Sequence, residues 1–511
     1  MKQRLKDNWV LISVFLLLGI YYLYRMFAIT PWYDEIYTYI NFIDKGVLYS
    51  ATNWPLPNNH VFFSMSSALL RWGGIYVGLR GISYLATLAT ILLLYDLFKK
   101  IFSKNISVAI VLCYSMLILS NNLAMQGRGY SLATFFLMLS VWSGYRICHE
   151  ESKKKDYIFW GVALWLGLYT VVSSVYWVIA VCLCAGVILL VLKKYKKLVA
   201  LVLTSLASAF TTLISYTILW LSVGAWQISN DVTSGYLGSD RWLLIRLFPR
   251  TCLVRGAEFM LADRSVQGID RGTFLRNFKY FARDTISAFF GDKNMWYFYG
   301  TVLVVCVCLL LWTISVIKQK TALLYPLTYG CFGFLGIFVS LFVHSAYPFT
   351  RVFSFLGIFL IMPLGLLFGC IALWLKKIIK WNKVDLLGYL FIAAFTIFTG
   401  ICLNDSTHMQ EYDYTDYYAY DAIENVDWNN VDSYLVSDVY AEQQVEYHLV
   451  LGDGKDICLD TEEPDVIITK KASLTGSWPD IITDQTLEDC SISEREILYE
   501  NILYIIYGPI N

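Results

Sequence analysis

Long apolar runs separated by short polar connections extend from the N-terminus to about residue 403. Most runs approach the roughly 20 residues that a helix needs to cross the hydrocarbon core of a bilayer. The pattern therefore predicts an α-helical polytopic membrane protein with about eleven transmembrane helices. The expected spans are about 9–29, 75–98, 106–120, 128–147, 158–172, 174–192, 198–222, 296–317, 322–343, 351–376 and 385–403.

The last hundred or so residues follow a different pattern. Short apolar runs at 434–436, 466–469 and 497–506 accompany a helical-looking segment at 439–451. Runs this short are typical of strands, so we expect a small C-terminal α/β domain. The expected division is a transmembrane domain over 1–403, with outer loops 30–74 and 223–295, and an acidic extracytoplasmic domain over 404–511.

Composition supports this division and excludes a soluble globular protein. The 511 residues are 57% apolar and only 16% charged, whereas an ordinary soluble domain has about 25% charged residues. The equal totals of 40 basic and 40 acidic residues hide an asymmetry, because residues 404–511 contain 24 acidic and 4 basic residues. Subtraction leaves 36 basic and 16 acidic residues before position 404. This distribution argues against nucleic acid as a partner, because phosphate backbones need clustered positive charge.

Loop charge predicts which side of the membrane each connection occupies. Basic residues Lys2, Arg4 and Lys6 precede the first run, which we interpret as an uncleaved signal anchor with a cytoplasmic N-terminus. Every second loop after it is rich in lysine or arginine, and such loops stay in the cytoplasm. The alternation predicts a multi-pass plasma-membrane protein whose C-terminal domain is extracytoplasmic. It also favours two helices over 158–192, because one helix would reverse all later loops.

Two of the twelve cysteines lie beyond the predicted transmembrane domain. Cys458 and Cys490 are both in the C-terminal region and would be able to pair in an oxidising compartment. The alternative is that both remain free thiols. No metal-ligand spacing is visible among the cysteines, and we expect no metal or other cofactor.

Adjacent carboxylates follow the first predicted helix. Asp34 and Glu35 stand in Pro31-Trp32-Tyr33-Asp34-Glu35, where the chain leaves the bilayer on its outer side. A carboxylate held there can act as a general base. The alternative for such a pair on its own is a solvated loop with no catalytic role.

Basic and aromatic residues gather on the same predicted outer side. His60 follows two asparagines, Arg80 enters the second helix, and Arg128 and Tyr130 enter the fourth. Arg351 stands at the tenth helix. Arginine so close to hydrocarbon marks a functional site by default, and two guanidinium groups suit a phosphate or pyrophosphate. The alternatives are a structural His60 and arginines that only extend toward the interface.

The outer loop 223–295 contains an interleaved basic and aromatic stretch, Phe274-Leu275-Arg276-Asn277-Phe278-Lys279-Tyr280-Phe281-Ala282-Arg283. This pattern predicts an amphipathic helix in the membrane interface. Its role is either attraction of anionic membrane lipids or simple anchoring.

Taken together and in order, these segments resemble the membrane glycosyltransferases of the GT-C fold. The resemblance is to the family 39-like group of protein O-mannosyltransferases and aminoarabinose transferases, over about residues 1–375. It rests on the acid pair, the Asn-Asn-His motif, Leu-Arg at the second helix, Gln-x-Arg-x-Tyr at the fourth, and an arginine after Tyr-Pro near the tenth.

The resemblance implies transfer of a sugar from a polyprenyl-phosphate-sugar donor to an acceptor glycan, lipid or protein on the outer face, with inversion at the anomeric carbon. By the same resemblance Asp34 would be the general base and Glu35 would support or orient it. Arg128 and Arg351 would hold the donor phosphate. His60, Arg80 and Tyr130 would be weaker candidates around the same cavity.

A transporter or flippase of lipid-linked sugars is the main alternative, because it too would have many helices and outer basic residues. Such a protein usually shows internal repeats and broken, polar helices at the membrane midplane. The spans differ in length and their charges gather at one face, so the sequence favours the transferase. A membrane-anchored scaffold that presents the acidic domain would need neither the acid pair nor so many spans.

Overall fold

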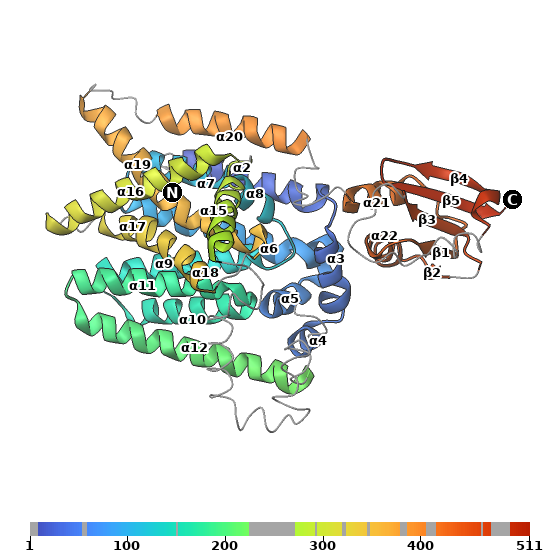
Figure 1. The fold of residues 1–511 in the computed structure, drawn as a ribbon, viewed down its shortest axis with the longest axis horizontal. Helices are drawn as coiled ribbons and strands as arrows, with labels where there is room; N and C mark the ends of the chain where they lie inside the picture. Colours follow the sequence, from blue (N-terminus) through green and yellow to red (C-terminus); the bar gives the residue numbers. More distant parts are fainter. Residues whose placement is uncertain are drawn as a thin grey trace.

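The computed structural model places the long helices side by side in one bundle, with a smaller unit that contains a β-sheet beyond one end (Figure 1). The described residues are 9–53, 59–149, 152–223, 271–291, 294–318, 323–344, 348–378, 386–404, 415–460, 463–471 and 491–510.

Within the described residues, eight helical segments are long and apolar enough to cross a membrane. They are α2 (Trp9–Ala28), α6 (Ile75–Lys99), α9 (Tyr130–His149), α11 (Val175–Val191) with the turn before it, α12 (Tyr195–Val223), α16 (Met295–Ile317), α17 (Leu324–Thr328) continued by η5 (Tyr329–Gly333) and α18 (Phe334–His344), and α19 (Leu356–Ile378). The remaining predicted spans overlap α7 (Lys104–Ser115), α10 (Lys154–Thr170) and α20 (Leu386–Asn404), which are not among these eight. The helix α7 has 12 residues and ends before the predicted limit at 120. The predicted polytopic helical fold is therefore confirmed.

Burial in the bundle follows the logic of a lipid solvent. Trp160 and Trp177 are fully buried between helices, whereas Leu303 and Leu310 on α16 are 65% and 66% exposed. Leucines so exposed to water would lose the hydrophobic stabilisation that burial provides, but hydrocarbon is as apolar as leucine itself. The outer surface of the bundle therefore suits a bilayer.

The stretch 158–192 forms two helices, as loop charge predicted. The helix α10 ends at Thr170 because Val171 adopts an extended conformation, with φ −142° and ψ 124°. A short 3-10 turn, η3 (Val172–Ser174), then leads into α11. The two helices agree with the predicted alternation of the later loops, which stays a prediction.

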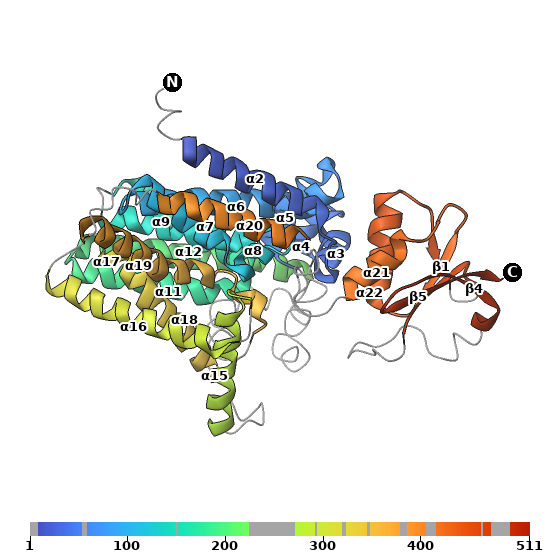
Figure 2. The ribbon, with the colours of Figure 1, turned by 90° about the horizontal axis from the view of Figure 1, so that it is seen from above.

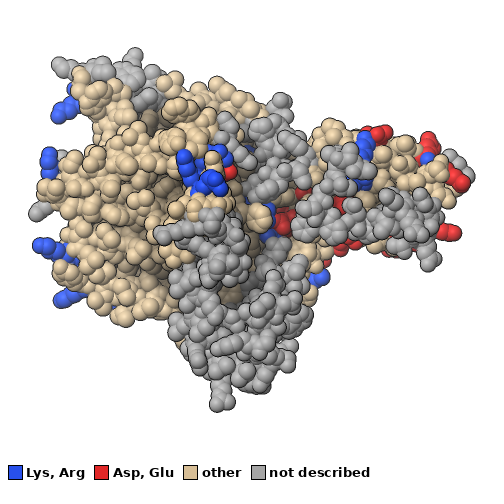
Figure 3. All heavy atoms as spheres, in the orientation of Figure 1, with Lys and Arg blue, Asp and Glu red and all other residues tan. Residues whose placement is uncertain are grey.

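Short helices occupy the end of the bundle that faces the C-terminal unit (Figures 1 and 2). They include α3 (Tyr33–Thr38), the π-helix η1 (Tyr39–Ile43), α4 (Val47–Thr52) and α5 (Val61–Ala68). Lysine and arginine side chains mark the opposite end of the bundle, and acidic side chains gather on the C-terminal unit (Figure 3). This polarity agrees with the predicted topology, which remains a prediction because the structure contains no membrane.

The C-terminal unit packs helices against a five-stranded sheet of order β2-β1-β3-β5-β4. Its strands are β1 (Ser433–Val436), β2 (Cys458–Leu459), β3 (Val466–Lys470), β4 (Arg495–Glu500) and β5 (Tyr504–Ile510), and its helices are α21 (Thr415–Glu424), α22 (Val439–Val445) and the π-helix η8 (Glu446–Gly452). The pairs β1–β2 and β1–β3 are parallel, whereas β3–β5 and β4–β5 are antiparallel. The predicted α/β character is confirmed, although the apolar run 497–506 divides into two strands.

Two further sequence predictions fall partly outside the described residues. The cysteine pairing cannot be followed, because Cys458 is exposed on β2 while Cys490 lies outside the described part. In the outer loop 223–295, residues 224–270 are also outside it. The predicted amphipathic segment forms α15 (Arg271–Ser287), which projects across the direction of the long helices (Figure 2).

Candidate active site

The acid pair lies on α3, which begins at Tyr33 after α2 has ended at Ala28 and the chain has bent at Ile29. The helix α3 begins after Trp32, whose backbone N–H donates to Glu35 Oε2 at 3.1 Å. Carboxylates in the first turn also interact favourably with the positive end of the helix dipole. Because successive helical residues point about 100° apart, the two acids face different partners.

Glu35 is enclosed by donors. It forms a buried, two-pronged ion pair with Arg80, whose Nε is 2.9 Å from Oε1 and whose Nη2 is 2.8 Å from Oε2. The backbone N–H of Gly127 also donates to this carboxylate. Arg80 in turn donates to the carbonyl oxygens of Met26 and Ile29 at the end of α2. This network joins α2, α3, α6 and the loop before α9, and both side chains are only 2% exposed.

Asp34 faces the other way, toward two arginines. Its Oδ2 is 3.1 Å from Nη2 of Arg351 and 3.8 Å from Nη2 of Arg128. Asp34 and Arg351 keep 14% and 18% of their side chains exposed, whereas Arg128 keeps 3%. Asp34 is therefore the more accessible acid, and it has positive charge beside it.

Arg128 is fixed by α3 itself. Its Nη1 donates to Thr38 Oγ1 at 2.8 Å and to the backbone carbonyl of Asp34 at 3.2 Å. Sequence reasoning did not single out Thr38, although its position one helical turn after Asp34 places both on the same face. The guanidinium and the acid it approaches are thus held by one short helix.

Glycines allow the loop around Arg128 to pass through a crowded space. Gly129 has φ +76°, and a Cβ there would lie 3.0 Å from Cβ of Phe63 and 3.1 Å from Cγ2 of Thr170. A Cβ at Gly127 would lie 2.9 Å from the carbonyl oxygen of Leu79. Positive φ and close approach are the two conditions that select glycine.

His60 lies at the N-cap of α5, directly before Val61. Its Nδ1 bonds with the carbonyl oxygen of Arg128, and its ring packs edge-on against Tyr130 at 5.3 Å between centroids. Burial, followed by the charges of Arg128 and Arg351, holds the pKa of His60 well below its usual value. The imidazole is therefore neutral near pH 7, and because a carbonyl only accepts, Nδ1 carries the hydrogen and Nε2 is the acceptor.

Aromatic rings support Arg351. This residue lies in η6 (Thr350–Phe353), and its guanidinium carbon is 5.2 Å from the ring centroid of Trp32 and 4.8 Å from that of Phe349. Cation–π contacts of this kind attract the guanidinium and help to hold it in partly dry surroundings. The structure thus brings together Asp34, Arg128, Arg351, His60 and Tyr130, and it places the Glu35–Arg80 pair directly behind them.

A further arginine, absent from the sequence predictions, lies in α2. Arg25 is 2% exposed, and it donates to the hydroxyl of Tyr21 and to Oδ1 of Asn121. A charged residue inside a predicted span was a signal that could have identified it.

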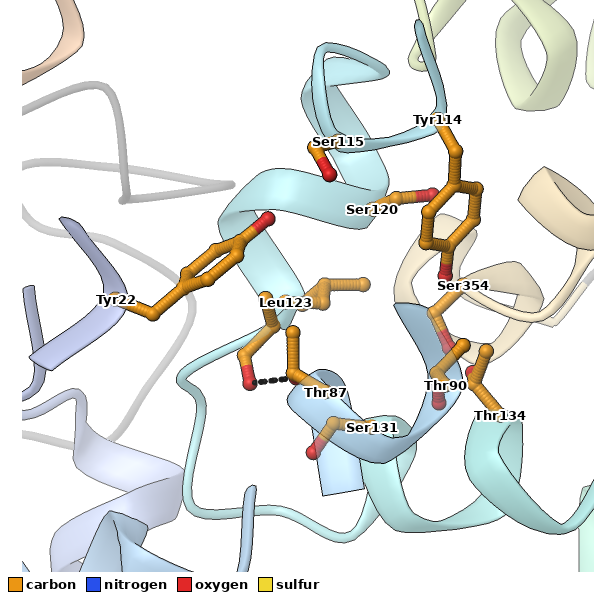
Figure 4. Close-up of a pocket in the computed structure, with 11 residues that line it drawn as sticks. Tyr22, Thr87, Thr90, Tyr114, Ser115, Ser120, Leu123, Ser131, Thr134 and Ser354 are labelled. Atoms are coloured by element: carbon orange, nitrogen blue, oxygen red, sulfur yellow. Dashed lines mark hydrogen bonds between the residues drawn. The ribbon is translucent and has the colours of Figure 1, made fainter. Parts of the chain in front are cut away.

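A small cavity of about 20 Å³ lies close by, between α2, α6 and α9 (Figure 4). Most of its lining residues carry hydroxyl groups, among them Thr87, Thr90, Ser131 and Ser354. This volume admits about one water molecule. Ser131 and Ser354 each follow one of the two arginines by three residues in the sequence.

Comparisons with known proteins agree with this architecture. Residues 62–220 match the family model described as dolichyl-phosphate-mannose-protein mannosyltransferase, a range that contains Arg80, Arg128 and Tyr130. No curated protein sequence matches the chain significantly.

Solved structures are similar over nearly the whole chain. The crystal structure of ArnT from Cupriavidus metallidurans in the apo state has a TM-score of 0.55 at 12% identity, with 98% of both chains covered. ArnT bound to undecaprenyl phosphate gives 0.53 at the same identity and coverage. The oligosaccharyltransferase of Archaeoglobus fulgidus gives 0.47 at 13% identity over 89% of this chain and 64% of the other. The likeness to ArnT shows that the chain has the GT-C fold.

Proposed function

We propose that this chain, a glycosyltransferase of the GT-C type, moves a sugar from a polyprenyl-phosphate carrier to an acceptor on the outer face of the membrane. The observation that carries the proposal is the contact of one accessible carboxylate, Asp34, with two arginines at the same end of the bundle. The family match and the binding of undecaprenyl phosphate by the similar ArnT support a lipid-linked donor.

In the proposed reaction, Asp34 accepts the proton of an acceptor hydroxyl or amine as that group attacks the anomeric carbon. The bond between this carbon and the phosphate oxygen breaks, and its electron pair leaves with the polyprenyl phosphate. Direct displacement inverts the configuration of the sugar. General base catalysis of this type contributes about 10²- to 10⁴-fold to the rate.

Arg128 and Arg351 would bind the donor phosphate and stabilise the negative charge that grows on it. Guanidinium groups suit this task because their planar fork matches phosphate oxygens and stays charged when partly buried. Fixed positive charge aimed at the leaving oxygen costs no rearrangement during the reaction. We assign neutral His60 and Tyr130 to the rim of the donor site, where His60 Nε2 can accept a hydrogen bond from a sugar hydroxyl.

We assign Glu35 and Arg80 a positioning role. Each is already satisfied by the other and by backbone groups, and 2% exposure leaves no room for a substrate. Their pairing holds α3 against α6 and so orients Asp34. Residues 1–403 would form the catalytic transmembrane domain, and 404–511 would form its extracytoplasmic domain.

The test is donor consumption by the purified protein in nanodiscs, with a panel of radiolabelled polyprenyl-phosphate sugars and candidate acceptors. We expect the wild type to consume one donor and Asp34→Asn to consume almost none. Asp44→Asn is the matched control, because it removes one exposed acid from the same outer region. The anomeric configuration of the product, read by NMR, tests inversion.

Retention of configuration would exclude direct displacement, and near-normal turnover by Asp34→Asn would remove the assigned base. Movement of labelled lipid between leaflets without donor consumption would instead indicate a flippase of lipid-linked sugars.

A further inference from the structure

The C-terminal unit contacts the bundle through α22 and η8, which lie on the side of its sheet that faces α3 (Figure 1). Neighbouring residues of this segment belong to two different cores. Val445 and Leu449 pack in the core of the C-terminal unit, whereas Tyr447 and Leu451 pack against the core of the bundle. The segment therefore joins the two units by burial on both faces.

Tyr447 is the main apolar contact of this junction. Its side chain is 1% exposed, and its ring packs edge-on against Tyr39 at 5.6 Å and against Tyr76 at 6.3 Å between centroids. Tyr39 follows α3 directly, and Tyr76 precedes Arg80 by one turn of α6. Its hydroxyl makes no hydrogen bond within the described residues, so the contact depends on the ring.

Gln444 and Tyr440 contact the residues at the start of α3 and just before it. Gln444 is fully buried, and its Nε2 donates to the carbonyl oxygen of Pro31 at 3.0 Å. The ring of Tyr440 lies 5.0 Å from that of Tyr33. Contacts from the C-terminal unit thus precede Asp34 at Pro31 and Tyr33, and follow it at Tyr39.

We propose that the C-terminal domain is a positioning element for catalysis, in which Gln444 and Tyr447 hold α3 so that Asp34 meets the acceptor. This inference rests on the function proposed above. The six residues of α3 and the five of η1 form one short helical stretch, and isolated helices shorter than roughly 12–15 residues are marginal in water. Packing against α6 on one side and the C-terminal domain on the other supplies the missing stabilisation.

The decisive comparison is between two truncations in the same π-helix. Tyr447→Ala removes the contact with the bundle, whereas Leu449→Ala removes a side chain from the core of the C-terminal domain. Misplacing a catalytic group by about 1 Å can cost about a hundredfold in rate. We therefore expect Tyr447→Ala to lower kcat by about tenfold to a hundredfold while KM for the donor stays near the wild-type value.

We expect Leu449→Ala to lower the melting temperature and to keep kcat at temperatures where the protein is folded. Tyr447→Phe should restore activity, because the hydroxyl is not used. The positioning role would be overturned if Tyr447→Ala and Leu449→Ala lost kcat equally, or if Tyr447→Ala lost none. In either case, transfer by the wild-type protein would still support the proposed glycosyltransferase function.

Hydrogen exchange gives a readout that does not depend on activity. In Tyr447→Ala, backbone amides of Tyr33–Thr38 should exchange faster than in the wild type, while those of β1 and β3 stay protected. Unchanged exchange in α3 would overturn the positioning role. A wild-type protein that consumes no lipid-linked sugar, with faster exchange in Tyr447→Ala, would refute the proposed function. The hold of the C-terminal domain on α3 would then stand without the catalytic purpose.

Discussion

Replacing Asp34 by asparagine should abolish transfer and at the same time tighten the binding of polyprenyl phosphate. In the structure the Asp34 carboxylate pairs with the two guanidinium groups that we assign to the donor phosphate. Its Oδ2 lies 3.1 Å from Nη2 of Arg351 and 3.8 Å from Nη2 of Arg128. Phosphate must share these arginines with the carboxylate and must also approach a like charge. Asparagine is nearly isosteric and removes both costs.

The magnitude follows from the distances. With an effective dielectric constant of about 20, charges at these two separations attract by roughly 5 and 4 kcal/mol before solvation is considered. Most of this attraction is offset by desolvation and by the remaining exposure of the side chains. A net change of about 1–2 kcal/mol remains, which corresponds to about 5- to 30-fold in Kd.

The assay is equilibrium binding of polyprenyl phosphate without a sugar to the protein in nanodiscs. Asp34→Asn should bind more tightly than wild type, and Arg351→Ala should bind more weakly. Asp44→Asn changes the net charge equally, but Asp44 lies ten residues beyond Asp34 in the sequence and outside the ion pairs of Asp34 with Arg351 and Arg128. The Kd of Asp44→Asn should therefore match the wild type. An unchanged or weaker affinity in Asp34→Asn would refute competition between this acid and the phosphate.

Three other changes test the supports of the site. Glu35→Gln leaves the Arg80 charge buried without its partner, so we expect the free energy of unfolding to fall by about 3 kcal/mol or more, seen as a lower melting temperature. Gly129→Ala should lower both stability and transfer, because φ is +76° and a Cβ would lie 3.0 Å from a neighbouring carbon, whereas Gly300→Ala in open space should be tolerated. Burial, followed by nearby arginine charges, depresses the pKa of His60 in the folded protein. The stabilising contribution of neutral His60 is therefore complete above about pH 6.5, the pKa of an unfolded histidine, and is lost as the pH falls toward the folded-state pKa. Melting temperatures should therefore drop from about pH 7 to about pH 5, and drop less in His60→Gln; equal slopes would exclude His60 as the source.

Sequence reasoning named the candidate residues, and the family resemblance gave Asp34 the role of base and Glu35 that of support, but neither showed the contacts that separate the two acids. It named both acids and placed them beside arginines of the second, fourth and tenth helices, because charges near hydrocarbon are rare enough to be informative. It did not identify Thr38 or Arg25, nor the contact of Tyr447 with the bundle. Threonine and tyrosine are common on helices, so nothing local distinguishes those that make a distant contact.

The sequence by itself determined the class of protein and its two-part organisation. Apolar runs of bilayer length, lysine-rich alternate loops and an acidic tail are local properties of the sequence. Their preference for hydrocarbon or for water does not depend on which distant residues they contact. The tertiary structure decided which acid remains accessible. Asp34 and Glu35 are adjacent in sequence, yet Glu35 is enclosed by Arg80 and by the N–H of Gly127, which are 45 and 92 residues away. Only the packing of α3 between α6, the loop before α9 and the C-terminal domain makes one acid a support and leaves the other facing the arginines.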